Sequence, residues 1–528
     1  MKNKIYIPLL FAIAIVLGIL IGTFLNYPKR NTVMLFSKSS SEAKIKRLID
    51  YIQYDYVDKV DTDSLLDGTI RNILRKLDPH SVYIPASEHD AITERMNGEF
   101  VGVGIQFRMY KDSLTVVQVI KGGPSDKAGI KAGDRILIAD KDTLYGKKLN
   151  TNYIFKTLKG EPNTKVNLIV YRKPEGTFLN FTLKRGSVPI NSIDAYYMLT
   201  DTLGYVKINK FAATTHDEFK KAMSALLKKG MQRLVLDLRG NPGGYLGVAT
   251  QIVDEFLEDD KLIVFTKNKG GKIDKTFATK KGDFENHKVY VLIDENSASA
   301  SEIVAGALQD NDKGVIVGRR SFGKGLVQQE MDLGDGSAVR LTVSRYYTPT
   351  GRSIQKPYGG KDGNAYYEDR LIRLHHGELT NADSIKVNDS LKFVTPKGKV
   401  VYGGGGIVPD VFVGIDTTAY FGAIDFEGVN NFVFDYAIDY HHKQFENLTF
   451  EDFKKNFDTD GKILNEYLAG INNRPQINMP TLKIYFKALF ARILFGESAF
   501  FEILNENDKM LEKVLALEKK PKISDFKN

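Results

Sequence analysis

Four short apolar runs in the middle of the chain constrain its fold more than any other feature. They are Tyr205–Ile208, Leu234–Leu238, Val289–Ile293 and Val315–Val317, and segments long enough for helices separate them. Apolar runs of this length, bounded by turn signals, are typical of strands buried inside a sheet. Strands that alternate with helices predict an α/β core beyond Ile190.

The regions on either side of this core differ from it in pattern. From Gly98 to Gly186 short β patterns alternate with turn signals, which indicates a small β domain with one short helix near 153–158. Apolar residues at helical spacing from Ser41 to Leu77 predict a helical region. The stretch 361–392 is polar and turn-rich, so we expect a surface excursion there.

The length of 528 residues is sufficient for several domains. After about Tyr420 the sequence has a helical pattern and no chemistry that we can interpret. The expected organisation is a membrane anchor at 1–30, an N-terminal helical region at 31–97, the β domain at 98–186, the α/β core at 187–415 and a helical accessory region at 416–528.

The N-terminal segment contains no charged residue from Ile5 to Asn26. At about 1.5 Å per residue this run can cross a hydrocarbon core roughly 30 Å thick, so it predicts an uncleaved membrane anchor. A cleaved signal peptide is the alternative, but Thr23–Asn26 lacks an Ala-x-Ala pattern. Basic residues lie on both sides of the run, so charge alone leaves the topology open.

Composition argues against several classes of chemistry. The chain has no cysteine, which excludes disulfides, thiolate metal sites and a cysteine nucleophile. Its formal charge of +9 comes from scattered basic residues, which indicates a solvated surface and no nucleic-acid partner. The eight histidines form no HExxH pattern and the carboxylates form no ligand loop, so we expect neither a metal nor an organic cofactor.

The strongest chemical signal is Val291–Leu308, a buried strand followed by a turn of small residues and a helix. Such an elbow lets a hydroxyl stand clear of the sheet above helix amides, which favours Ser299 as a nucleophile. The competing interpretation is a helix cap, because Ser299 and Glu302 have the spacing of a capping box. Taken alone, the segment fits the cap better.

A lysine between two glycines follows the next strand, in Ser321–Gln328. A serine hydroxyl needs a base, and Lys324 can serve as one if desolvation lowers its pKa. No histidine lies in or beside these segments, so a Ser-His-Asp triad has no support. Gly318–Gly325 also matches the GxxxxGK pattern of a P-loop, but Gly325 stands where the magnesium-binding Ser or Thr would be.

Two glycine-rich turns offer backbone amides to a ligand. Asp237–Gly244 follows a buried strand and ends in paired glycines, so its amides can form part of an oxyanion hole. An ordinary βα turn explains the same residues equally well. Gly98–Ile105 opens the β domain, and amides beside a strand edge can bind the carboxylate of a peptide that adds as an extra strand.

Together these motifs resemble those of the carboxyl-terminal processing peptidases, also called tail-specific proteases, over roughly residues 77–411. The resemblance implies a multidomain α+β chain in which the β domain is PDZ-like and the core is a crotonase/ClpP-like serine endopeptidase. The motifs that carry it are Leu77–Ser81, the PDZ-like run Gly123–Asp134, Asp237–Gly244, Ser297–Glu302, Gly323–Gly325 and Gly406–Asp410.

The resemblance also implies roles for individual residues. It implies a Ser-Lys dyad that forms an acyl-enzyme, and a groove in the PDZ-like domain that binds the apolar carboxyl-terminal tail of a protein substrate. The implied catalytic set is Ser299 as nucleophile, Lys324 as general base and Gln328 and Asp310 as supporting residues, with the amides of Gly244 and Ala300 as the oxyanion hole. The implied groove residues are Phe100, Val101, Gly102, Val103, Gly104 and Ile105, with Ile154 and Leu158 on the helix side.

The resemblance further implies a single-pass protein of the bacterial inner membrane with its catalytic domain in the periplasm. The substrates, the oligomeric state and the need for an adaptor stay open. A hypothesis from another class is a membrane-tethered PDZ scaffold without turnover. The intact serine, lysine and glutamine positions argue against this scaffold.

Overall fold

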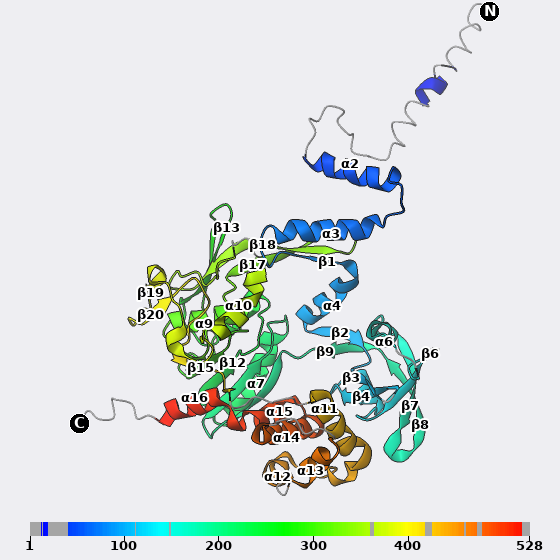
Figure 1. The fold of residues 1–528 in the computed structure, drawn as a ribbon, viewed down its shortest axis with the longest axis vertical. Coiled ribbons are helices and arrows are strands. Elements are labelled where there is room, and N and C mark those ends of the chain that lie inside the picture. The colour runs from blue at the N-terminus through cyan, green and yellow to red at the C-terminus, as the bar shows by residue number, and fades with distance from the viewer. Residues whose placement is uncertain are drawn as a thin grey trace, which may run out of the picture. The chain divides into compact units, whose positions relative to one another are not determined.

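The structure is a computed structural model that forms two compact units, Met1–Asn72 and Ile73–Asn528 (Figure 1). Within the first unit lie α2 (Ser41–Tyr54) and most of α3 (Thr62–Arg75), as the helical pattern predicts. The described residues are 12, 14–18, 41–110, 112–146, 149–358, 364–417, 425–458, 461–471 and 478–519.

The predicted membrane anchor at Ile5–Asn26 lies mostly outside the described residues. Among the helices that are described, none combines the length and the apolarity that a membrane span requires. The anchor therefore stays a prediction from the sequence.

The predicted α/β core is a six-stranded sheet in which the strands lie in the order β10-β11-β12-β15-β16-β21. The first strand runs antiparallel to its neighbour, and the other pairs are parallel. Parallel strands need crossover connections, and helices supply them here. The bounds are β10 (Ile193–Met198), β11 (Leu203–Ile208), β12 (Arg233–Asp237), β15 (Lys288–Ile293), β16 (Gly314–Gly318) and β21 (Val411–Phe412).

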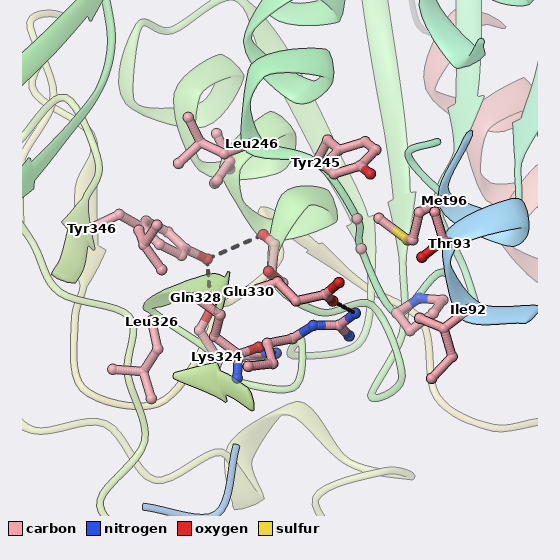
Figure 2. A pocket seen from close by; sticks show the side chains of 17 residues that line it. Ile92, Thr93, Met96, Tyr245, Leu246, Lys324, Leu326, Gln328, Glu330 and Tyr346 are labelled. Atoms are coloured by element: carbon pink, nitrogen blue, oxygen red, sulfur yellow. Dashed lines mark hydrogen bonds and ion pairs between the residues drawn. The ribbon is translucent and has the colours of Figure 1, made fainter. Parts of the chain in front are cut away.

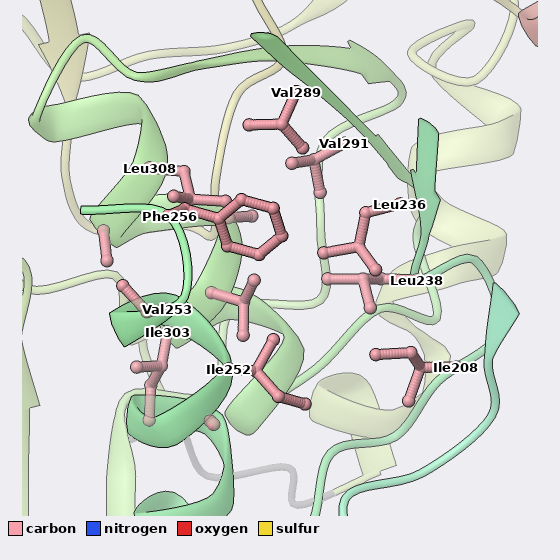
Figure 3. Packing of buried hydrophobic residues seen from close by; sticks show 14 of the residues in the cluster. Ile208, Leu236, Leu238, Ile252, Val253, Phe256, Val289, Val291, Ile303 and Leu308 are labelled. Atoms are coloured by element: carbon pink, nitrogen blue, oxygen red, sulfur yellow. The ribbon is translucent and has the colours of Figure 1, made fainter. Parts of the chain in front are cut away.

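Helices cover both faces of this sheet. On one face pack α7 (Thr215–Lys228), α8 (Leu246–Asp254) and α9 (Ala300–Asp310). Figure 3 shows this cluster, with side chains of the strands facing side chains of α8 and α9. On the other face packs α16 (Lys509–Lys519), through buried residues near the C-terminus of the chain. The inner strands are thus shielded from water, which explains the continuous apolar runs in the sequence, whereas the edge strand β21 is half-buried.

A second, antiparallel sheet was not predicted from the sequence. Its strands lie in the order β1-β18-β13-β14, and β17 pairs with β18. The motif Ser321–Gln328 leads into β17, so this sheet carries one of the segments with chemical signal. The bounds are β1 (Val82–Ile84), β13 (Leu262–Asn268), β14 (Ile273–Phe277), β17 (Leu326–Asp332) and β18 (Ala338–Tyr347).

The PDZ-like domain forms its own sheet in the order β3-β4-β5-β7-β8, with β6 on β5. Strand β3 therefore lies at an edge, where a further strand can pair with it. A ribbon of β2 with β9 connects this domain to the rest of the chain. The bounds are β2 (Glu99–Gly102), β3 (Ile105–Tyr110), β4 (Ser113–Val119), α5 (Pro124–Ala128), β5 (Arg135–Ala139), β6 (Asp142–Thr143), α6 (Thr151–Leu158), β7 (Lys165–Arg172), η1 (Lys173–Glu175), β8 (Thr177–Lys184) and β9 (Gly186–Pro189).

The remaining segments include one correction. The stretch 361–392, expected as a surface excursion of turns, contains the helix α10 (Asn364–His375). The region after Tyr420 is helical, as predicted, and it encloses its own apolar core. Other elements are α4 (Ala86–Asn97), η2 (Ala382–Ser384), η3 (Asp389–Leu391), β19 (Lys392–Val394), β20 (Val400–Tyr402), α11 (Phe426–Phe434), η5 (Asp435–Tyr440), η6 (His442–Gln444), α12 (Phe450–Asn456), α13 (Lys462–Ala469), α14 (Met479–Phe495), α15 (Glu497–Leu504) and η7 (Asn505–Asn507).

Candidate active site

Ser299 lies at the elbow between β15 and α9, directly before the first residue of the helix. Its backbone has φ +55° and ψ −113°, a region that serine rarely adopts. Such strain costs of order 1–3 kcal/mol and persists only where the surroundings fix it, commonly at active sites. The hydroxyls of the two neighbouring serines are buried and donate to backbone carbonyls, Ser297 to Leu238 at 2.9 Å and Ser301 to Asn241 at 3.0 Å.

Glu302 joins the serine segment to the lysine segment. Its fully buried carboxylate accepts the backbone N–H of Ser299 at 2.8 Å and that of Lys324 at 2.9 Å. It also accepts the Ser321 hydroxyl at 2.5 Å and the Gly323 N–H at 2.7 Å. Burial raises the pKa of this carboxyl, and the four donors oppose that rise. One side chain therefore fixes the spacing between both segments.

The same contacts bear on the P-loop interpretation of Gly318–Gly325. A P-loop needs its backbone N–H groups directed at phosphate oxygens. Here the amides of Gly323 and Lys324 donate to Glu302, and the amide of Gly325 donates to the side chain of Gln355 at 2.8 Å. These donors are occupied, so the loop offers no phosphate cradle.

The Lys324 amine is held in place by two successive hydrogen bonds. It donates to the side-chain oxygen of Gln328 at 2.8 Å, and the Gln328 amide donates in turn to the backbone carbonyl of His80. Burial lowers the pKa of this lysine, and the positive charge of Arg340 lowers it further, while the charges of Glu302 and Asp78 oppose the shift. A lysine with a lowered pKa is closer to the free-base form that a general base requires.

Ser299 and Lys324 line the same cavity, whose volume is about 430 Å³ (Figure 2). The Tyr346 hydroxyl lies 3.1 Å from the carbonyl oxygen of Ser299 and 2.7 Å from that of Lys324, so it fixes both backbones from a third side. No histidine is among the described residues that line the cavity. Its apolar walls are Ile92, Met96, Leu246, Ile303, Leu326 and Val327.

The glycine turn before α8 lies against Ser299. A Cβ at Gly243 would be 2.8 Å from the Cβ of Ser299 and 2.9 Å from the backbone nitrogen of Ala300. A Cβ at Gly244, whose φ is +151°, would be 2.1 Å from the carbonyl oxygen of Phe211. Only glycine fits at either position. The close approach to Ser299 and Ala300 explains Gly243, and the close approach to the Phe211 backbone explains Gly244.

Asp310 lies at the far end of α9 and is not among the described residues that line the cavity. Its carboxylate accepts a hydrogen bond from the fully buried Arg352 at 2.7 Å, and from the Thr350 hydroxyl at 2.6 Å. Asp310 was expected as a supporting residue, and its contacts lie outside the cavity, at the C-terminal end of α9. Its contacts act on the position of α9 and not on the reacting groups.

Sequence comparisons bear directly on this site. A profile of peptidase family S41 matches residues 202–362. Carboxy-terminal processing protease CtpA of Bacillus subtilis is 32% identical over 353 residues, which cover 66% of this chain and 75% of that protein. The chain belongs to peptidase family S41.

Other relatives of this S41 chain have similar names. Carboxy-terminal processing protease CtpB of Bacillus subtilis is 34% identical over 59% of this chain and 65% of that protein. A probable CtpA-like serine protease of Staphylococcus aureus is 33% identical over 59% of this chain and 62% of that protein. The solved photosystem II D1 C-terminal processing protease is 26% identical, covering 71% of this chain and 87% of that chain, with a TM-score of 0.36.

Three further profiles match outside the core. A PDZ domain profile matches residues 101–184, so the PDZ-like domain is a PDZ domain. The profile of the activating protease CtpB N-terminal domain matches residues 27–87. Residues 427–496 match a family of unknown function.

The PDZ groove differs in part from the prediction. Ile154 and Leu158 are 0% and 3% exposed and pack inside the domain core, so they do not present a free surface to a ligand. Instead Phe155 on α6 is 43% exposed and contacts Phe107 on β3, with ring centroids 5.4 Å apart. The ring of Phe100 folds over Gly102, where a Cβ would be 2.8 Å from it.

The remaining predicted groove residues are mostly buried. Gly102, Val103, Gly104 and Ile105 are buried, and Val101 is half-buried. The carbonyl of Val103 accepts the Ser125 N–H at 2.9 Å, which holds this loop against α5. The contact with α5 therefore fixes the loop Gly102–Ile105, which leads into the edge strand β3.

Sequence reasoning missed several residues of the site. Glu302 was visible only as half of a capping box, and nothing in the sequence indicated that its carboxylate also reaches Lys324. Tyr346 and α4 gave no signal, because their proximity to Ser299 depends on the second sheet. Phe107 could have been found, since it follows Ile105 by two positions on the same face of a strand.

Proposed function

We propose that this chain is a serine endopeptidase that cuts polypeptides near their carboxyl-terminal tails. Ser299 is the nucleophile and Lys324 the general base. The observation that carries the proposal is the cavity in which a strained serine at a helix start shares its walls with a lysine whose pKa is lowered by burial. Family membership supports the same reaction class.

The reaction begins when the free amine of Lys324 takes the proton of the Ser299 hydroxyl as its oxygen attacks the carbonyl carbon of the scissile bond. The negative charge on the carbonyl oxygen is stabilised by the backbone N–H groups of Ala300 and Gly244. The intermediate then expels the amine product, which takes the proton back from Lys324, and an ester on Ser299 remains. Lys324 then takes a proton from a water molecule, whose oxygen attacks the ester. The Ser299 oxygen leaves and takes that proton back from Lys324, which releases the acid product and restores the free amine.

Gln328 keeps the Lys324 amine oriented during these transfers. Its side-chain oxygen accepts from the amine, and its own orientation is fixed by the bond that it donates to His80. Burial lowers the pKa of His80 to about 4, and the nearby charge of Lys324 adds to this effect. His80 is therefore neutral at working pH and adds no positive charge beside the base.

We infer that the substrate tail adds as a strand along the free edge of β3. Its terminal carboxylate binds at the loop Gly102–Ile105, and an apolar final side chain packs near Phe107 and Phe155. The exposed aromatic surface of Phe155 supports this placement. We also propose that Ile5–Asn26 anchors the chain in the bacterial inner membrane with the catalytic domain in the periplasm, which membrane fractionation would test.

The experiment that tests the proposal compares wild type with Ser299→Ala and Lys324→Ala on an unstructured polypeptide with an apolar tail. Both variants should lose cleavage by at least about 10³-fold while remaining folded. A serine-directed phosphonate should label Ser299 in the wild type, as read by mass spectrometry. Undiminished cleavage by Ser299→Ala would refute the assignment, and tail binding without cleavage or labelling would favour the scaffold hypothesis.

A further inference from the structure

The C-terminal helical module, defined here as residues 426–519, is fixed to the protease core. Met510, Leu511 and Val514 of α16 are buried against one face of the core sheet. Polar contacts add to this attachment, since the Asn505 side chain donates to the Tyr197 hydroxyl at 2.8 Å and Arg239 pairs with Asp508 at 2.5 Å. The module is therefore anchored to the core by apolar packing and by ion pairs.

The same module contacts the PDZ domain through one almost fully buried carboxylate. The Asp439 side chain is 1% exposed and pairs with Lys173 at 2.7 Å and with Arg135 at 3.2 Å. Both cations belong to the PDZ domain. Removing this carboxylate would leave the two cations, which are 30% and 16% exposed respectively, without their shared partner. Asp439 is therefore the residue whose loss should loosen this contact most.

A second set of contacts reaches the edge strand β3. The Arg108 guanidinium donates to the Asn431 side chain at 2.6 Å and lies 4.4 Å from the ring centroid of Phe434. The Tyr110 hydroxyl donates to the carboxylate of Asp435. Both PDZ residues lie in the second half of β3, the strand along which the tail is proposed to pair.

The PDZ backbone also fits the module closely. At Gly133, whose φ is +89°, a Cβ would be 2.3 Å from the side chain of Ile438. Any larger residue would push the two surfaces apart. The contact is thus apolar and shape-matched at Ile438, and ionic at Asp439 on the same π-helical turn, η5.

The PDZ domain also has other connections to the rest of the chain. They include the two-stranded ribbon of β2 with β9 and an ion pair between Lys159 and Glu94 of α4. A two-stranded ribbon is a weak support on its own. The ribbon holds β3 near its start, and the helical module holds it near its end.

We propose that the helical module holds the PDZ domain at a fixed distance from Ser299. This distance then sets how many residues separate the first cut from the carboxyl terminus of the substrate. This inference rests on the proposed function. A tail pinned on β3 and a scissile bond at Ser299 must be joined by enough residues to span a constant distance, at most about 3.3–3.6 Å per residue. If the PDZ domain could swing, that span would vary and the cuts would spread.

The first test measures the position of the PDZ domain without any chemistry. The chain has no cysteine, so Lys141→Cys in the PDZ domain and Lys281→Cys in the core accept two unique spin labels. In a Ser299→Ala background we expect a narrow distribution of the distance between the two spin labels. Adding Asp439→Asn and Asn431→Ala should make this distribution about twofold wider. The matched control is Glu446→Gln, an exposed carboxylate of the same module that should leave the width unchanged.

The second test reads the cut sites by mass spectrometry, with active protein and an unstructured polypeptide that carries an apolar tail. Wild type and Glu446→Gln should give one dominant first cut in this polypeptide. The double variant Asp439→Asn, Asn431→Ala should cut it at a spread of positions. The same double variant should cleave a short tail-less peptide at the wild-type rate. An unchanged distance width or an unchanged cut pattern would overturn the proposal. Faster cleavage of the tail-less peptide by the double variant would also overturn the proposal, because the module would then inhibit the wild-type enzyme. If no protein cleaves at all, the proposed function fails, and the distances still decide whether the module holds the PDZ domain.

Discussion

Glu302 accepts the backbone N–H of Ser299 and that of Lys324 with the same carboxylate oxygen, at 2.8 and 2.9 Å. The proposed nucleophile and base come from different segments, one before α9 and one before β17. A shared acceptor makes their separation depend on one side chain. Positioning to within a fraction of an ångström is what a proton transfer of this kind requires.

Replacing Glu302 with glutamine should damage both stability and turnover. The amide would direct an NH2 group at backbone donors, and each buried donor left unpaired costs about 1–3 kcal/mol. We expect kcat to fall by at least about tenfold with KM nearly unchanged. Steady-state kinetics and urea unfolding measure the two effects. Ser321→Ala removes only one of the four donors and should cost much less, so equal losses in both variants would contradict this role.

The pH dependence of activity should respond to Arg340. Its positive charge helps to lower the pKa of Lys324, so Arg340→Gln should raise that pKa. A higher pKa leaves less free amine at neutral pH. The rising limb of the kcat/KM profile should therefore move to higher pH, and activity at pH 7 should fall. Arg345→Gln, an exposed arginine on the same strand, is the control, and a limb that stays in place in Arg340→Gln would refute the argument.

A methyl group at Gly244 should displace the turn that is proposed to form part of the oxyanion hole. The new Cβ would be 2.1 Å from the Phe211 carbonyl oxygen, so the turn must shift away from Phe211 and leave its present position. We expect kcat/KM to fall by about 10²-fold or more. Gly247→Ala is a matched change three residues later in α8, with nothing within 4 Å of its Cβ. It should retain activity and gain about 0.5–1 kcal/mol of stability, as thermal unfolding can verify.

Phe155→Ala should weaken recognition of tails without affecting chemistry. Loss of an exposed aromatic contact in the groove should raise KM for tailed substrates by about tenfold, with kcat unchanged. Tyr153 on the same helix is exposed to a similar degree, 42% against 43%, and its hydroxyl donates to Asp142. Tyr153→Ala should leave KM near wild type. Equal effects of the two substitutions would place the tail elsewhere.

Asp310→Asn should act on folding and not on the reaction. The change leaves the fully buried Arg352 without its ion pair, at a cost of about 3–5 kcal/mol. At low temperature, where the protein stays folded, kcat should remain near the wild-type value. Thermal unfolding and kinetics on the same sample separate an effect on folding from an effect on the reaction. A large loss of kcat in fully folded protein would show that Asp310 acts on the reaction itself.

Much of the architecture could be predicted from local patterns. The strands of the core sheet appear as apolar runs because both sheet faces are covered, and α6 and the C-terminal helices follow from helical spacing. The second sheet could not be predicted in this way. Its strands come from three segments that lie far apart in sequence, namely β1, the β13–β14 pair and the β17–β18 pair, and many of their residues are half-exposed. Helix α10 (Asn364–His375) was missed because half of its residues are polar or charged and the sequence around it is rich in turn residues.

The sequence by itself determined which residue types can perform the chemistry. It placed a serine at a strand-to-helix elbow, a lysine between glycines and paired glycines at a turn, because each of these depends on local backbone geometry. Only the tertiary structure decided that Glu302 joins two of these segments, that Asp310 lies away from the cavity and that Ile154 and Leu158 face the PDZ core. Those outcomes depend on which surfaces pack together, and long-range packing is not encoded in any short stretch of the chain.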